Sequence, residues 1–193
     1  RVDIQRGFLQ FFPPEIMGAH VGTAPAHTTG RTQSLGFAAA VALPGHFGME
    51  FDLRQLSAAA RDELAQWVAL YKQLRGRLHT GRVWRGDAGD GLVWQAHGGD
   101  DAAELLLFVY RTAPTNHRYM PPLRLPMLDR GAAYRITQLA HGGAGHPWGS
   151  APLLDAIQSP DGAVLHGAWL AEAGLPLPRT QAEHAHILRL QRI

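Results

Sequence analysis

The residues of this sequence that could take part in chemistry gather in one short loop near its start. His20 and His27 lie seven positions apart, and Arg31 closes the segment after Gly30. Imidazole and guanidinium groups donate hydrogen bonds, so the loop could bind a ligand that carries hydroxyl groups. Alternatively, His20 is buried and hydrogen-bonded and fixes the loop, while Arg31 pairs with a carboxylate or with carbonyl groups. The sequence leaves both interpretations open.

A βα unit is the element expected to position this loop. Residues 15–21 are a nearly continuous apolar run, typical of a strand buried on both faces, and residues 34–43 form a helical pattern rich in small residues. In α/β proteins the loop that follows a strand lines the active site. We further expect a helix over residues 1–12, and a long amphipathic helix that starts at Ser57 and ends before Gly81.

From Gly81 onward the hydrophobic period changes to two, which is typical of strands. Turn sequences rich in Asp and Gly separate the apolar runs. This pattern predicts an antiparallel sandwich or Greek-key domain with a boundary near Thr80. The expected strands cover residues 83–84, 92–97, 104–111, 123–125, 134–137, 164–170 and 184–191.

The exact residues at the first fifty positions indicate a protein family, which their hydrophobic periodicity alone does not. It resembles glycoside hydrolase family 36, the α-galactosidases of bacteria and their relatives. The resemblance rests on Arg1, the run Ile-Gln-Arg-Gly at 4–7, the run Phe-Pro-Pro-Glu-Ile-Met-Gly-Ala-His-Val-Gly at 12–22, His27, Gly30-Arg31 and the run Gly-His-Phe-Gly-Met-Glu at 45–50. The later part of the chain resembles the small β domain of that family less specifically.

The resemblance implies an α/β fragment followed by an all-β antiparallel Greek-key sandwich. Residues 1–80 would be the last βα unit or units of a (β/α)8 TIM barrel, and residues 81–193 the C-terminal sandwich. The implied activity is that of a retaining glycosidase, which removes terminal α-galactose from oligosaccharides by double displacement. His20, His27 and Arg31 would then border the substrate, directly or from behind the groups that contact it.

The two aspartates that the resemblance implies as nucleophile and acid/base would precede Arg1, so no catalytic residue is assigned. A retaining glycosidase needs two carboxylates about 5 Å apart. Glu50 and Asp52 would share one face of an extended segment, but they precede a helix, where acids favour the helix dipole. The remaining candidates are turn aspartates.

One strand and three helices cannot close an eight-stranded barrel. We therefore expect the N-terminal part of the barrel to be a partner that is missing from residues 1–193. Such a piece should expose strand edges and apolar faces, so it should self-associate or be partly disordered, and we expect a homo-oligomer.

Composition narrows the remaining function classes. Cysteine is absent, no third ligand stands at a diagnostic spacing from His184 and His186 or from His141 and His146, and we expect neither a metal nor a cofactor. The formal net charge is only +2, and basic residues are scattered apart from Arg75, Arg77, Arg82 and Arg85, which argues against nucleic-acid binding. No apolar run is long enough to span a membrane, and we expect a cytoplasmic location.

A noncatalytic carbohydrate-binding or interaction module is the alternative. Tryptophan rings in the β region could form a platform on which a sugar stacks, although alternation within strands more often places such residues in the core. The candidates are Trp84, Trp94, Trp148 and Trp169.

Overall fold

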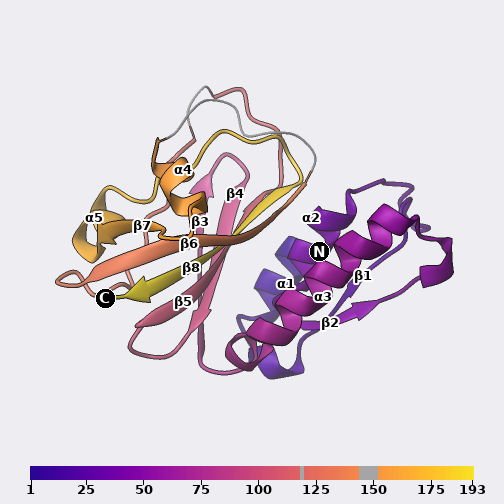
Figure 1. The fold of residues 1–193 in the computed structure, drawn as a ribbon, viewed down its shortest axis with the longest axis horizontal. Coiled ribbons are helices and arrows are strands. Elements are labelled where there is room, and N and C mark those ends of the chain that lie inside the picture. Colours follow the sequence, from indigo (N-terminus) through magenta and orange to yellow (C-terminus); the bar gives the residue numbers. More distant parts are fainter. Residues whose placement is uncertain (118–119, 144–151) are drawn as a thin grey trace.

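The computed structural model describes residues 1–117, 120–143 and 152–193. Figure 1 shows two parts side by side: the first helices with a small parallel sheet, and a larger antiparallel sheet carrying two short helices. His146 and Trp148, which were considered from the sequence, lie outside the described residues.

The first part is a βαβα unit preceded by a short helix. Strands β1 (Gly18–Val21) and β2 (His46–Met49) pair in parallel, with Ala19 opposite Phe47. Helix α2 (Leu35–Ala42) connects them, and α3 (Ala58–Leu78) follows β2. Ser34 and Ser57 cap these helices, because each hydroxyl accepts a hydrogen bond from a backbone N–H in the first turn. The minor elements are α1 (Val2–Phe8), η1 (Pro14–Ile16) and η2 (Leu53–Gln55).

The second part is a six-stranded antiparallel sheet in the order β3-β4-β5-β8-β6-β7. Its last strand, β8, inserts between β5 and β6, so the C-terminal segment is central to the sheet. The elements are β3 (Arg82–Gly89), β4 (Leu92–Gly98), β5 (Glu104–Arg111), β6 (Ala133–Gly142), α4 (Pro152–Gln158), β7 (Ala163–His166), α5 (Gly167–Glu172) and β8 (His184–Arg192).

Two hydrophobic cores lie on opposite faces of this sheet. One contains Trp94, Leu107 and Leu188 and is closed by α4, α5 and the segment before β6. The other contains Leu106, Phe108 and the apolar sides of α2 and α3. Every residue of β4 is buried as a result, and the shared sheet joins the two parts of the chain.

The antiparallel architecture predicted after Gly81 is confirmed, with local differences. Residues 123–125 contribute a single bridge, from Leu123 to Leu175, rather than a strand. The expected strand over residues 164–170 ends at His166, and α5 begins at Gly167. A Cβ on Gly167 would overlap the carbonyl oxygen of Asp129, so α5 starts where the backbone passes very close to the turn before β6. Among the described residues no helix is long and apolar enough to cross a membrane.

Several large apolar side chains of the first part face solvent. Phe11 is 80% exposed and Ile4 is 74% exposed, and Phe12 and Ile16 are also exposed. The helix expected over residues 1–12 ends at Phe8, and Phe11 and Phe12 follow in the turn before the prolines. These exposed apolar side chains lie on α1, on η1 and in the turn between them.

Candidate functional site

The carboxyl ends of β1 and β2 form the edge at which the candidate site lies. In the parallel register His20 lies opposite Gly48, and Val21 lies opposite Met49. The His20 ring covers Gly48 so closely that a Cβ there would lie 2.7 Å from its Cδ2 atom. His20 is exposed, so its interpretation as a buried, hydrogen-bonded residue is wrong, and its imidazole is accessible to a ligand.

The loop after β1 is held by bonds within itself. The backbone N–H of Ala26 donates to the Arg31 carbonyl at 2.8 Å, and that of Gly30 donates to the Ala26 carbonyl at 2.7 Å. Gly30 has a φ of +67°, which glycine adopts without strain. The Nδ1 atom of His27 lies 3.1 Å from the Thr23 hydroxyl, and its ring is exposed. The sequence thus folds this segment into a closed loop that presents His27 to solvent.

Arg31 is bound to the β domain. Its guanidinium forms an ion pair with the carboxylate of Glu183, just before β8, and the Gln33 amide donates to the same oxygen at 3.0 Å. Glu183 has a φ of +60°, an uncommon conformation for a residue other than glycine. Arg31 therefore follows the structural alternative predicted for it, pairing with a carboxylate, and it anchors the loop across 152 positions of sequence.

Arg1 is a neighbour of the site that sequence reasoning did not place there. Its guanidinium donates to the carbonyl of His20, and a Cβ on Gly22 would lie 3.1 Å from its Nη2 atom. No spacing in the sequence signals this contact, because it joins the start of α1 to the end of β1. The structure thus brings Arg1 together with His20, while Arg31 is directed to Glu183.

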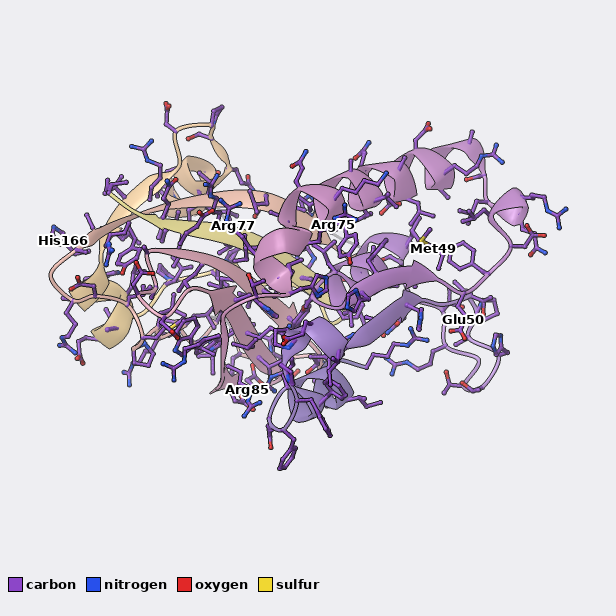
Figure 2. All side chains as sticks on the ribbon, turned by 90° about the horizontal axis from the view of Figure 1, so that it is seen from below. Met49, Glu50, Arg75, Arg77, Arg85 and His166 are labelled. Carbon is purple, nitrogen blue, oxygen red and sulfur yellow. The ribbon has the colours of Figure 1, made fainter. Side chains whose placement is uncertain are left out.

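The carboxylates after β2 have different surroundings. Asp52 caps η2 and lies 2.8 Å from Arg54, whose hydrogen bonds lower the pKa of Asp52. Glu50 is exposed at the end of β2, and its backbone N–H donates to the Val21 carbonyl at 2.9 Å. Figure 2 shows Met49 and Glu50 at the end of β2 that lies away from the larger sheet. Glu50 is thus an accessible carboxylate at the same edge as His20.

The histidines of β8 lie beside one on β6. The His141 and His184 rings stack 6.0 Å apart, and the His184 and His186 rings lie 4.8 Å apart. Burial lowers the pKa of His184 to about 4 and that of His186 to about 3, so both are neutral at pH 7. Within the described ranges no group of three His, Cys, Asp or Glu side chains could hold a metal ion. His184 and His186 belong to the interior of the β domain, whereas His141 lies at its surface.

Three of the four arginines that stand close together in the sequence contact different partners. Arg77 pairs with Glu104 at 3.1 Å, Arg82 lies 3.7 Å from Asp100, and Arg85 donates to the Arg6 carbonyl at 3.1 Å. Figure 2 shows Arg85 well separated from Arg75 and Arg77. They do not form a continuous basic stripe.

A parallel βαβα unit with polar side chains at its strand ends, packed on an antiparallel sheet, is the arrangement expected for the end of a β/α barrel followed by a C-terminal β domain. Comparison with known families agrees. The Melibiase family model matches residues 1–81, and the model of the glycosyl hydrolase family 36 C-terminal domain matches residues 93–190. The chain belongs to glycoside hydrolase family 36, and its later part corresponds to the C-terminal domain of that family.

Individual relatives support this assignment. The α-galactosidase of Escherichia coli is 34% identical over the whole chain, which covers 28% of that protein. Probable α-galactosidase G of Aspergillus terreus is 34% identical over 80% of the chain, which covers 21% of it. A crystal structure of a variant of the α-galactosidase AgaA from Geobacillus stearothermophilus in complex with raffinose matches the whole chain with a TM-score of 0.78 at 27% identity. The chain covers 24% of that structure and thus spans about a quarter of such relatives.

Proposed function

We propose that this chain takes part in the hydrolysis of terminal α-galactose from oligosaccharides, with retention, as the end of the catalytic barrel and its C-terminal β domain. The observation that carries the proposal is the accessible polar edge at the carboxyl ends of β1 and β2, where His20 lies over Gly48. In β/α barrels this end of the strands carries the active site. Family membership supplies the class of substrate.

The site residues have distinct proposed roles. His20 and His27 are exposed imidazoles at the strand end and in the loop, and they border the sugar, where they can donate to its hydroxyl groups. Arg31 acts from behind them, because its guanidinium is engaged by Glu183 and holds the loop on the β domain. In this scheme residues 1–80 close the barrel, and residues 81–193 form the domain that supports it.

The nucleophilic and acid/base carboxylates of the proposed double displacement come from the rest of the barrel. The exposed apolar side chains over α1 and η1 support this view, since such a surface is stabilised by being covered. Where that surface stays uncovered, we expect copies of the chain to associate with one another.

Intact mass and hydrolysis test the proposal together. A purified protein of 21.0 kDa should leave p-nitrophenyl α-galactoside intact, and hydrolysis would then refute the placement of both carboxylates outside this chain. A larger protein that contains this chain should hydrolyse the substrate, and its failure would refute the proposed activity. In the active protein His20→Ala should lower kcat/KM, whereas His166→Ala, at the exposed end of β7, is the matched control.

One observation favours a second function, noncatalytic carbohydrate binding. Trp94 is buried and Trp84 is partly buried, as the core interpretation predicts, but Trp169 on α5 is 54% exposed. An exposed indole can stack on the apolar face of a sugar ring. A change in tryptophan fluorescence on adding galactose, lost in Trp169→Ala, would support this function, and an unchanged spectrum would exclude it at Trp169.

A further inference from the structure

A polar groove lies on the β domain, away from the strand ends described above. It has a volume of about 430 Å³ and lies between the first half of β6, the C-terminal end of β8 and the turn that follows α4. Figure 1 shows α4 beside β6, with β8 as the next strand of the sheet. The turn forms one wall, since a Cβ on Gly162 would lie 2.6 Å from Cγ2 of Thr137 and 3.3 Å from Cγ of Arg135.

The strand register builds the floor of this groove. Arg135 lies opposite Gln191, and Thr137 lies opposite Arg189. Side chains two apart on a strand share a face, so these four side chains form a two-by-two grid. The grid continues the face that packs against α2 and α3, because Ile187 and Ala185 on the same side of β8 belong to that core. The groove therefore occupies the part of the sheet that these helices leave uncovered.

Positive charge exceeds negative charge around this grid. The Nε atom of Arg189 lies 2.7 Å from Glu104, and Arg77 at the end of α3 binds the other oxygen of the same carboxylate at 3.1 Å. The single carboxylate of Glu104 thus pairs with two guanidinium groups. Arg135 is exposed and forms no ion pair with any residue that the structure describes. The groove therefore offers one free guanidinium beside a second that is only partly neutralised.

The groove is lined mainly by hydrogen-bond donors. Besides the two arginines it is lined by the amides of Gln158 and Gln191 and by the hydroxyls of Thr137 and Ser159. Neither a carboxylate nor an aromatic ring lines it within the described part of the chain. A neutral sugar is usually held by an aromatic face, whereas guanidinium groups bind phosphate in a forked geometry.

We propose that this groove of Arg135, Thr137, Arg189 and Gln191 is a binding site for an oxyanion of the phosphate class. Arg135 supplies the principal contact, Arg189 shares its charge between Glu104 and the ligand, and the amide and hydroxyl groups complete the donor set. The volume falls within the range of small-molecule sites, so a phosphorylated small molecule fits as well as the bare ion. The site does not depend on glycosidase activity.

Phosphate titration of the whole protein tests this proposal. Inorganic phosphate is exchanged for chloride at constant ionic strength, and binding is followed by calorimetry and by amide shifts of Thr137 and Gln191. We expect saturable binding that Arg135→Gln weakens about tenfold, the effect of one charge-assisted hydrogen bond. Arg130→Gln changes net charge equally at an exposed position that pairs with Glu172, and it should leave the affinity unchanged.

A variant that should strengthen phosphate binding distinguishes a specific site from general attraction between charges. Glu104→Gln removes the carboxylate that neutralises Arg189 and should strengthen phosphate binding about threefold. Equal weakening by Arg135→Gln and Arg130→Gln, or no saturation by phosphate, would overturn the proposal. So would weaker binding in Glu104→Gln.

Comparing the affinities for phosphate, glucose 6-phosphate and glucose identifies the source of the oxyanion. Tighter binding of glucose 6-phosphate than of phosphate would identify a phosphorylated small molecule. Equal affinities would identify the free ion, and both results support the site. Binding of glucose as tight as that of glucose 6-phosphate would overturn it, because the ligand would then be recognised without its charge.

Discussion

Acid should destabilise this fold well above the pH at which carboxylates are protonated. His97 on β4 shows the reason. Its Nδ1 atom donates to the Leu78 carbonyl at the end of α3 at 3.1 Å, and its Nε2 atom lies 3.2 Å from the Gln95 amide. A second proton on Nε2 would face an amide donor within a buried site. Burial lowers the pKa of His97 to about 4, as it lowers those of His184 and His186.

The magnitude follows from proton linkage. Each of these histidines is protonated near pH 6.5 in the unfolded chain but only near pH 3 to 4 in the fold, so below about pH 6.5 the unfolded chain binds the extra protons. Stability is complete above that pH and falls by about 1.4 kcal/mol per pH unit for each histidine. The three together should lower the free energy of unfolding by about 5 kcal/mol between pH 6.5 and pH 5, a large share of the stability of an ordinary domain.

Urea unfolding followed by circular dichroism at about pH 7, 6 and 5 measures this effect. The urea midpoint should fall steeply as the pH is lowered. His97→Gln should reduce the dependence of stability on pH by about one third. His166→Gln, at an exposed position visible in Figure 2, is the control that should leave the slope unchanged. A midpoint that is constant from pH 7 to pH 5 would refute the argument that these rings are kept neutral by burial.

Three further predictions concern the packing of α2 and α3 and the anchoring of the loop that contains Arg31. Gly142→Ala should lower the free energy of unfolding by about 1–3 kcal/mol, because a Cβ there would overlap the backbone of α2. Gly76→Ala should instead raise it by about 1 kcal/mol, because this position on α3 has open space around it and alanine favours the helix. Thermal unfolding of the two variants measures the difference. Ser57→Ala should lower the unfolding free energy by about 1 kcal/mol through loss of the α3 cap, and an unchanged midpoint would contradict this. Glu183→Gln should cost at most about 1 kcal/mol but speed amide exchange around Arg31, and unchanged exchange would show that the ion pair does not anchor the loop.

Local signals predicted much of the first part. The cap predicted at Ser57 fixed the start of α3, and the small residues after Ser34 indicated a helix packed closely on neighbouring strands. The bounds of β2, in contrast, were not predicted, because its register is set by pairing with β1 rather than by its own four residues. A short segment carries too little pattern to define its bounds.

The site was predicted less completely, for a related reason. The loop with His20 and His27 was identified from its residue types, but its partners Arg1 and Glu183 are distant in sequence and on different elements. The exposure of His20 depends on Gly48 of the neighbouring strand, which leaves room for the ring. Such contacts follow from tertiary packing, and residue spacing alone does not contain them.

The burial of β4 and β5 on both faces has a consequence for the evolution of this chain. One side of β4 and β5 completes the interior of the β domain, and the other side completes the interior formed with α2 and α3. A recombination event that joined only the segment after Thr80 to another gene would turn Leu106 and Phe108 toward water. We therefore expect these two segments to descend together as one evolutionary unit, unlike appended modules that are exchanged freely between enzymes.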